Sequence, residues 1–365
     1  MTPPETSSQP PADIDRDEPG NWYPHNWARI DEQLQALAPP DPSGVKPQPA
    51  AVFDFDNTCI FHDIGQATFL YQLLRLRYRI TPDQLAALLP RDDERLPTGI
   101  PAAAVHAPLI DSYRRLWPAI AADRPDEVLD LPAHRLFSTL LLWFVQQARQ
   151  APELGPEYVL PFMAKLLAGF TTSEVEHLAV EVIDAAKQGP LTPIQLTVDA
   201  PPPIGPIAVQ YPRGLHPYPE MRTLMQRLAA HGVACFVISA STEWLVTGAV
   251  RRLDFPVEHE RIFGIRVRLD GKHLTTEAPV AYPTTFRAGK VEVIHQHIRT
   301  TPFLVAGDAD TDYEMLTLPG VRLRLLINRQ QSGMISSLYH RPDILLQGVD
   351  LATGRFVPSR ESTGC

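Results

Sequence analysis

Acidic side chains crowd a short stretch directly behind an apolar run. Residues 53–63 read FDFDNTCIFHD after AAVF and contain Asp54, Asp56 and Asp63. Solvated acids on an edge strand or turn would explain them, but AAVF is typical of a buried parallel strand that these acids interrupt. Because Asp54 and Asp56 are two residues apart, their side chains point to the same side of an extended chain. The pair is therefore a candidate for shared acid–base or cation chemistry.

Further polar signals follow strand-like or helical segments later in the chain. Ser239 closes FVIS, Lys290 stands at the start of a helical pattern, and GDADTD contributes Asp308 and Asp312. Each alone is weak, because a serine after a strand is usually a turn residue or helix cap and a lysine at a helix start is usually solvated. Strand and helix patterns alternate in this part, which predicts a doubly wound parallel sheet. Ligands of such sheets bind beyond the carboxyl ends of the strands, so we expect these residues to meet there.

Taken in order, these signals resemble the four motifs of the haloacid dehalogenase superfamily in its phosphatase branch. The resemblance covers about residues 40–62 and 210–330, and the segment between them matches only in position and helical character. It implies an α/β fold with a Rossmann-like core and a helical cap domain inserted between the first and second motifs. In the family such a cap closes over the site, excludes water and selects substrates. The implied activity is phosphomonoester hydrolysis.

The resemblance also implies a role for each motif residue. Asp54 would be the nucleophile that becomes an aspartyl-phosphate, and Asp56 the acid that protonates the leaving oxygen and later activates water. Thr58 would orient Asp56 through the local turn at the phosphate-binding end of the site, although an ordinary turn threonine is the alternative. Ser239 would donate a hydrogen bond to a phosphoryl oxygen. Lys290 would balance the negative charge of nucleophile and phosphate.

A metal cation is expected among the aspartates. Like charges about 4 Å apart cost several kcal/mol at an effective dielectric near 20, so four carboxylates could not crowd together ionised without one. Oxygen ligands with room for waters and a phosphate oxygen suit Mg²⁺. The resemblance places the metal on Asp54, on the main-chain carbonyl of Asp56 and on Asp308, with Asp312 as a nearby acid of the metal site. GDADTD departs from the usual GDGxND at its third and fifth positions, which affects the finer metal contacts.

Asp63 is the candidate for substrate selection. It stands nine positions after Asp54, and in phosphoserine phosphatases an acid at that spacing contacts the substrate amine. DNTxxxxD also resembles the bacterial phosphorylcholine phosphatases, whose cap is helical, and INRQQSG and LLQGVD are similar to that group's tail. A helix N-cap or a solvated acid is the alternative for Asp63. We expect a phosphorylated amino-alcohol as substrate, phosphorylcholine ahead of phosphoserine.

Aromatic side chains of the cap could enclose a quaternary ammonium group, although most of them are expected in the core. They are Tyr71, Tyr113, Trp117, Trp143 and Tyr158.

Composition argues against several classes of protein. The formal charge of −9 and the pI near 5.7 disfavour a nucleic-acid binder that neutralises many phosphates. No apolar run is long enough for a membrane span, and the N-terminus lacks the basic start and apolar core of a secretory signal. The three cysteines are far apart and form neither a zinc pattern nor a disulfide framework. We therefore expect a cytoplasmic protein with a small-molecule substrate and neither nucleic acid nor membrane as a partner.

The chain is expected to divide into a tail, a core and a cap. Residues 1–20 are rich in proline, serine and acids and are predicted to be disordered. Residues 21–63 and 206–365 are predicted to form the phosphatase core, and residues 64–205 the helical cap, in which no clear strand appears. In the core, NWYPHNWARIDEQLQAL is expected as a lead-in helix and FGIRVRLDGKHLTT as a hairpin with an Asp-Gly turn.

Two other functions stay open. A phosphotransferase on the same fold would pass the phosphoryl group to an acceptor other than water, and the sequence does not separate it from a hydrolase. A catalytically silent binding protein is disfavoured because every motif position carries a competent residue. Dehalogenases of the superfamily lack the paired acid, and a P-type pump would need membrane spans, so both are disfavoured.

Overall fold

The structure is a computed structural model that describes residues 20–37, 47–90 and 94–364. Apart from Gly20, the predicted disordered tail lies outside the described residues. No helix in the described part of the chain is long and apolar enough to cross a membrane.

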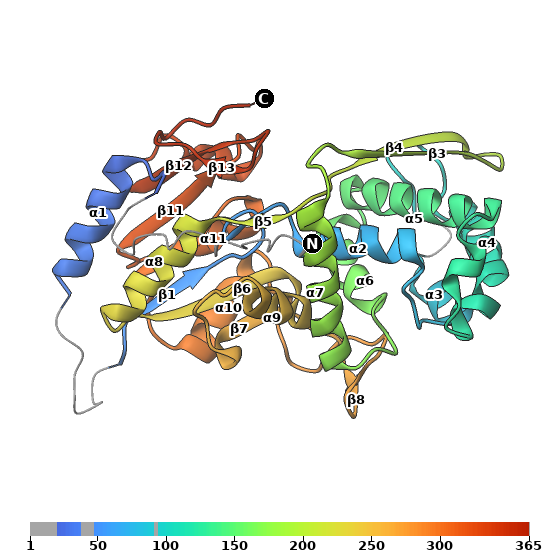
Figure 1. Ribbon diagram of the computed structural model, residues 1–365, viewed down its shortest axis with the longest axis horizontal. Helices are drawn as coiled ribbons and strands as arrows, with labels where there is room; N and C mark the ends of the chain where they lie inside the picture. Colours follow the sequence, from blue (N-terminus) through green and yellow to red (C-terminus); the bar gives the residue numbers. More distant parts are fainter. Residues whose placement is uncertain (1–19, 38–46, 91–93, 365) are drawn as a thin grey trace, which may run out of the picture.

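A seven-stranded sheet forms the centre of the core (Figure 1). Its order is β13-β12-β11-β10-β1-β6-β7, and all neighbouring pairs are parallel except β12 and β13. The strand that precedes Asp54, β1, lies in the interior of the sheet, because it pairs with β10 on one edge and β6 on the other. The predicted α/β fold with a doubly wound parallel sheet is confirmed. The strands are β1 (Ala50–Phe53), β6 (Ala234–Thr242), β7 (Ile262–Ile265), β10 (Leu304–Gly307), β11 (Leu323–Asn328), β12 (Ile344–Asp350) and β13 (Arg355–Phe356).

Helices cover both faces of the sheet. Successive side chains of β1 point to opposite faces and therefore enter two different apolar cores. Ala51 and Phe53 pack in one apolar core with α1, α8 and α9, whereas Val52 packs in a second core with α10 and α11. The predicted lead-in helix is α1. Gly232 follows the end of α8 with a φ of +76°, a backbone conformation that favours glycine. These helices are α1 (Pro24–Gln35), α8 (Pro219–Ala230), α9 (Glu243–Arg252), α10 (Ala288–Val293), which continues as a π-helical turn (Ile294–Ile298), and α11 (Tyr313–Leu316). Short 3-10 turns are η2 (His259–Arg261), η4 (Asp310–Asp312) and η5 (Met334–Leu338).

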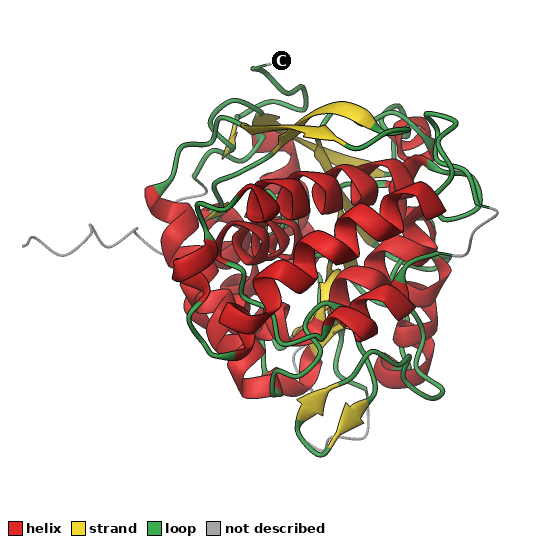
Figure 2. Cartoon of the chain, turned by 90° about the vertical axis from the view of Figure 1, so that its right-hand side faces the viewer, coloured by secondary structure: helices red, strands yellow, loops and turns green. Residues whose placement is uncertain are grey.

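The segment inserted after β1 forms a helical layer with its own apolar core (Figure 2). Tyr113, Phe137 and Phe144 are buried in this cap core. Two helices of this layer begin at a capping box. The side chain of Thr81 or Thr171 accepts from the backbone N–H three residues later, and the glutamine or glutamate at that later position accepts from the backbone N–H of the threonine. The helices are α2 (Ile64–Arg75), α3 (Pro82–Leu88), α4 (Ala103–Ala121), η1 (Pro125–Val128), α5 (Pro132–Gln150), α6 (Gly155–Lys165) and α7 (Thr172–Gln188).

An antiparallel hairpin of β3 (Ile194–Ala200) and β4 (Gly205–Tyr211) carries the chain back toward the sheet. The expectation that no strand occurs within residues 64–205 is therefore wrong. Apolar side chains of β3 pack against the cap core, and the polar residues between them are exposed. This alternation is typical of a half-buried strand, but the proline-rich flanks concealed it. The predicted boundaries of core and cap stay predictions.

Short antiparallel pairs connect the layers. β2 (Ile60–Phe61) pairs with β5 (His216–Pro217), so the segment that follows Asp54 is joined to the segment that returns from the cap. β8 (Leu269–Asp270) and β9 (His273–Leu274) form a hairpin around the predicted Asp-Gly turn. The hairpin is shorter than predicted because residues 263–265 belong to β7 of the main sheet. This hairpin contacts the helical layer through hydrogen bonds with the backbone of the segment between α6 and α7 (Figure 1).

Candidate active site

Asp54 directly follows β1 at the carboxyl edge of the sheet and is buried. Its backbone N–H donates to the carbonyl of Ala306 at 2.9 Å, which continues the pairing of β1 with β10. Its Oδ1 accepts from Nζ of Lys290 at 2.5 Å, and its Oδ2 accepts from Oγ1 of Thr58 at 3.2 Å. The carboxylate of Asp54 is therefore fixed by the strand, by a lysine and by a threonine.

Lys290 lies in α10 and is fully buried. The N-terminus of α10 packs closely on the preceding loop, because a Cβ at Gly289 would lie 1.8 Å from the carbonyl oxygen of Thr284. Nζ of Lys290 donates to Oδ1 of both Asp54 and Asp312, at 2.5 and 2.6 Å. Burial by itself lowers the pKa of a lysine, but the carboxylates of Asp312 and Asp54 more than offset it and raise the pKa of Lys290. Lys290 is therefore a permanent cation between two acids.

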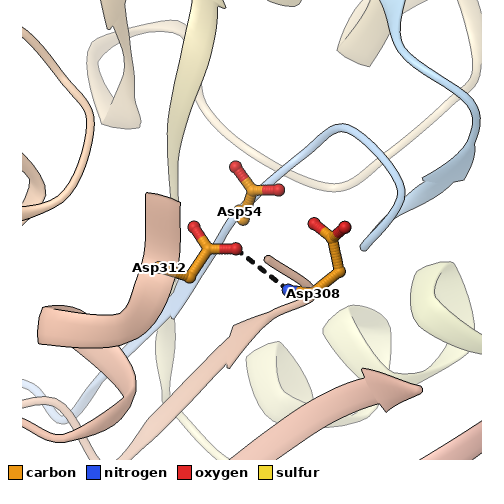
Figure 3. Close-up of side chains that lie close together, drawn as sticks. All are labelled: Asp54, Asp308 and Asp312. Atoms are coloured by element: carbon orange, nitrogen blue, oxygen red, sulfur yellow. Dashed lines mark hydrogen bonds between the residues drawn. The ribbon is translucent and has the colours of Figure 1, made fainter. Parts of the chain in front are cut away.

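Asp312 closes the turn that follows β10 (Figure 3). Its Oδ2 accepts from the backbone N–H groups of Asp308 at 2.9 Å and Ala309 at 3.2 Å. A side chain at Gly307 would place its Cβ 2.6 Å from Cβ of Asp312, so this approach requires glycine. Since its Oδ1 is bound to Lys290, both oxygens of Asp312 are engaged. Asp312 therefore positions the turn and the lysine, in keeping with a nearby acid of the metal site.

A compact group of three buried carboxylates could hold a metal ion. Oxygen atoms of Asp54, Asp308 and Asp312 lie within 4.8 Å of one another (Figure 3). Oγ1 of Thr58 also lies 3.3 Å from Oδ1 of Asp308, so this threonine contacts two of the three acids. Buried carboxylate oxygens at this spacing are the donors that Mg²⁺ prefers.

The electrostatics of the group also fit a divalent cation. Burial raises the pKa of Asp54 well above its usual range, Asp312 raises it further, and Lys290 opposes them. Burial likewise raises the pKa of Asp308. A cation beside these carboxylates would favour their ionised forms. The residues present therefore fit the metal that the resemblance implies.

Asp56 lies beside this group in a different environment. Its Oδ1 accepts from the N–H of Ile64 at 2.7 Å, and its Oδ2 accepts from Oγ of Ser239 at 2.9 Å. Burial, together with the charge of Asp63, raises the pKa of Asp56 to about 8. The turn that directs this side chain includes Asn57 with a φ of +58°, in the left-handed region that asparagine tolerates. Asp56 can therefore carry a proton near neutral pH, as a general acid requires.

Ser239 lies within β6, which continues to Thr242 through an irregularity in its pairing with β7. Ser239 therefore lies near the carboxyl end of this strand, which extends past FVIS. The hydroxyl of Ser239 donates to Asp56 and accepts from the N–H of Ser241 at 2.9 Å. The irregularity occurs where the strand reaches the site. Its predicted contact with a phosphoryl oxygen stays a prediction.

Asp63 caps α2 and also lines a small cavity. Its Oδ1 accepts from the N–H of Gln66 at 2.8 Å and from Oγ of Ser241 at 3.4 Å, so the N-cap alternative is correct. The cavity, of about 30 Å³, lies between α2, α5, α6 and the end of β6. Thr68 and Arg149 line it as well, and the hydroxyl of Thr68 is buried without a partner among the described residues. Asp63 is thus the N-cap of α2, lines this cavity, and acts on the nearby Asp56 through its charge.

The cap aromatics pack in the apolar cores, as expected for most of them. The five candidates pack among the helices, and none of them lines the cavity beside Asp63 within the described part of the chain. The hydroxyl of Tyr71 donates to Glu181 and that of Tyr113 to the carbonyl of Ile80. Helical spacing placed these rings on buried faces, where packing uses them.

Arg329 belongs to the site although the resemblance gave this residue of INRQQSG no role. It directly follows β11, and its Nη1 donates to Oδ2 of Asp308 at 2.7 Å. Of the two side chains, 24% of Arg329 and 3% of Asp308 are exposed. β11 pairs in parallel with β10, so the residues after both strands meet at one edge. The signal in the sequence was LRLLIN, a buried strand pattern that ends at an arginine.

The chain matches a known protein family. A model of the haloacid dehalogenase-like hydrolases matches residues 111–317, which is more than half of the chain. The chain is therefore a member of that family, and the predicted superfamily is confirmed. The matched span contains Ser239, Lys290, Asp308 and Asp312 and begins after Asp54.

A solved structure shares the fold of this chain. A conserved, functionally unknown protein from Anaerococcus prevotii DSM 20548 is 24% identical, with a TM-score of 0.84 over 96% of this chain and 99% of its own. A protein of unknown function from Bordetella pertussis Tohama I is 16% identical, with a TM-score of 0.44 over 84% of this chain and 100% of its own. A phosphoserine phosphohydrolase-like protein from Francisella tularensis subsp. tularensis SCHU S4 is 10% identical, with a TM-score of 0.38 over 81% and 94%. The first likeness shows the fold alone, and the other two carry no conclusion. No curated protein matches the chain.

Proposed function

We propose that the protein is a metal-dependent phosphomonoester hydrolase with Asp54 as its nucleophile. The observation that carries this proposal is the contrast between two acids on one turn. Asp54 contacts the buried ammonium group of Lys290, whereas Asp56 has a pKa raised to about 8 by burial and by Asp63. Burial raises the pKa of Asp54 as well, so the two roles separate when Lys290 and a bound cation keep Asp54 ionised while Asp56 stays protonated, as a nucleophile and a general acid require. Membership of a hydrolase family supports the same reaction class.

The reaction follows in two steps. A carboxylate oxygen of Asp54 attacks phosphorus, the bond from phosphorus to the leaving oxygen breaks, and Asp56 gives its proton to that oxygen. The products are an aspartyl-phosphate, a neutral alcohol and an ionised Asp56. Asp56 then takes a proton from water, whose oxygen attacks phosphorus and releases Asp54 as a carboxylate and phosphate as the product. One difficult displacement becomes two easier ones.

Countercharge and positioning come from the neighbouring residues. Lys290 provides fixed positive charge beside Asp54, and Ser239 would turn its hydroxyl from Asp56 to a phosphoryl oxygen. The side chains of Asp54 and Asp308 and the main-chain carbonyl of Asp56 would hold a divalent cation, for which we propose Mg²⁺. When bound, the cation offsets the repulsion between the anionic site and the phosphate. Thr58 connects the two carboxylates that would share it.

We further propose a small phosphorylated amino-alcohol, such as phosphorylcholine, as the substrate. Both hydrogen bonds to Asp63 use Oδ1, and the described residues provide none to Oδ2. Oδ2 is thus available for an ammonium group. A carboxylate that meets an ammonium group in a water-poor site contributes roughly a few kcal/mol, enough to select one substrate over another.

Phosphoserine is a second candidate, and Arg149 is the observation that favours it. Arg149 and Asp63 line the same cavity, so the cavity presents one cation and one anion. A serine leaving group carries both complementary charges, whereas choline carries only the positive one. Arg149→Gln should lower kcat/KM for phosphoserine by about tenfold or more and leave phosphorylcholine unaffected.

Phosphate release from a panel of phosphomonoesters, with and without Mg²⁺, tests this function. Turnover should require the metal, and phosphorylated amino-alcohols should be preferred. Asp54→Asn keeps the shape of the side chain and removes its charge, so it should abolish turnover of every ester, a generic aryl phosphate included. Comparable turnover by the variant would contradict the assignment of the nucleophile. Added alcohols would divert phosphate into new esters if the protein were a phosphotransferase.

A further inference from the structure

Arg329 brings a second fixed cation into the site. Its guanidinium donates to Oδ2 of Asp308 at 2.7 Å, while Oδ1 of Asp308 faces Thr58. An arginine keeps its charge at any accessible pH, so the contact persists as an ion pair. Asp308 is also the acid that would ligate the metal with Asp54. The carboxylate of Asp308 therefore has two possible partners, the guanidinium of Arg329 and the metal.

The charges that act on Arg329 belong both to the aspartate group, through Asp308, and to the cavity lined by Asp63. Its guanidinium interacts electrostatically with Asp308, Tyr218 and Asp63. The hydroxyl of Tyr218 is buried and without a hydrogen-bond partner among the described residues, and the charges that act on it are those of Arg329, Asp308 and Glu220. The guanidinium of Arg329 is partly exposed and its Nη1 is bound to Asp308, so its other N–H groups can donate to an oxyanion.

We propose that Arg329 competes with the divalent metal for Asp308 and, with the metal in place, binds the phosphoryl group of the substrate. The inference rests on the proposed function. A cation that holds Asp308 opposes metal entry through charge repulsion and through its claim on Oδ2. Once the metal holds Asp308, the guanidinium is free to donate two hydrogen bonds to phosphoryl oxygens, a geometry that suits arginine.

The proposal predicts effects of opposite sign for Arg329→Gln. The variant should bind Mg²⁺ about tenfold more tightly, because a positive charge and a competitor are removed. With Mg²⁺ bound, it should bind inorganic phosphate at least about tenfold more weakly, because a charge-assisted donor is lost. A merely structural role for Arg329 would weaken both or change neither. Arg329→Lys should keep Mg²⁺ affinity near that of the wild type and still weaken phosphate binding, because the forked donor is lost.

Calorimetric titration of the metal-free full-length chain with Mg²⁺, and of the Mg²⁺-loaded chain with inorganic phosphate, measures both effects without turnover. Arg341→Gln is the matched control, since Arg341 is exposed and pairs with Asp343. Its two affinities should equal those of the wild type.

The outcomes separate the inference from the proposed function. Unchanged affinities in Arg329→Gln, or a loss of both, overturn the inference even where the wild type hydrolyses esters with Mg²⁺. A wild-type protein that neither binds Mg²⁺ nor hydrolyses any ester overturns the proposed function and the inference with it. If Arg329→Gln does not fold, Arg329→Lys decides: weaker phosphate binding at unchanged Mg²⁺ affinity supports the inference, and unchanged phosphate binding overturns it.

Discussion

Nζ of Lys290 lies 2.5 Å from Oδ1 of Asp54, and neither side chain is more than 6% exposed. The same ammonium group also contacts Asp312, so one buried cation joins the end of β1 to the turn after β10. Buried charges of this kind are stable only as a set, because removing one member leaves the others uncompensated.

Lys290→Met should therefore destabilise the metal-free protein by about 3–5 kcal/mol, the usual effect of breaking a buried pair. Adding Asp312→Asn should restore part of this loss, because one of the two uncompensated carboxylates is then neutral. Urea unfolding of the single and double variants, both prepared without metal, measures the difference. A double variant less stable than the lysine variant alone would contradict the charge argument.

Mg²⁺ should stabilise the wild-type protein by preferential binding to the native acidic group. At a free concentration of 100 times the dissociation constant, the gain in unfolding free energy should be about 2.7 kcal/mol. Thermal unfolding with increasing Mg²⁺ measures it, and Asp308→Asn should abolish the shift. Asp343→Asn is a suitable control, since that acid pairs with Arg341 on the surface. A melting temperature that Mg²⁺ does not change in folded protein would argue against a metal site.

Asp56→Asn should affect alkyl phosphates far more than aryl phosphates, because only poor leaving groups need protonation. The loss for alkyl esters should be about 10²- to 10⁴-fold. In the wild type, burial and Asp63 raise the pKa of Asp56 to about 8, so the protonated acid is present below that pH and is lost above it. kcat/KM for alkyl esters should therefore fall as the pH rises through about 8, with a smaller change for aryl esters. Equal pH profiles for the two ester classes would exclude Asp56 as the acid.

Asp63→Asn separates substrate binding from helix capping. Asparagine is as good an N-cap as aspartate, so the variant should keep the start of α2 while losing the charge in the cavity. kcat/KM for phosphorylated amino-alcohols should fall by about one to three decades, while an uncharged aryl phosphate is largely unaffected. Steady-state kinetics on both esters is the measurement. Equal losses would show that Asp63 supports the fold or the metal site alone.

The residues predicted from sequence are those whose position depends on local pattern. A buried parallel strand is recognisable as an apolar run, and the residue after it must lie at the carboxyl edge of the sheet. Asp54 and Asp308 were found this way, because β1 and β10 are adjacent and parallel. The α/β fold and the hairpin at the Asp-Gly turn have equally local causes.

The sequence could not predict the features of the site that depend on which elements become neighbours in the fold. Arg329 joins the site only because β11 lies beside β10. Ser239 lies inside its strand because pairing with β7 continues past an irregularity, which no residue of FVIS indicates. The cap aromatics have helical spacing that suits either a binding face or a packed face, and tertiary contacts determined the choice.

Rapid acid quenching during turnover of a phosphomonoester with Mg²⁺, followed by peptide mass spectrometry, tests the central claim most directly. Acid preserves an acyl phosphate long enough to locate it, and borohydride reduction marks its carboxyl carbon. We predict that the peptide containing Asp54 carries the phosphoryl group, and that Asp54→Asn carries none. Turnover with no phosphorylated residue, or with the phosphoryl group on another side chain, would contradict Asp54 as the nucleophile.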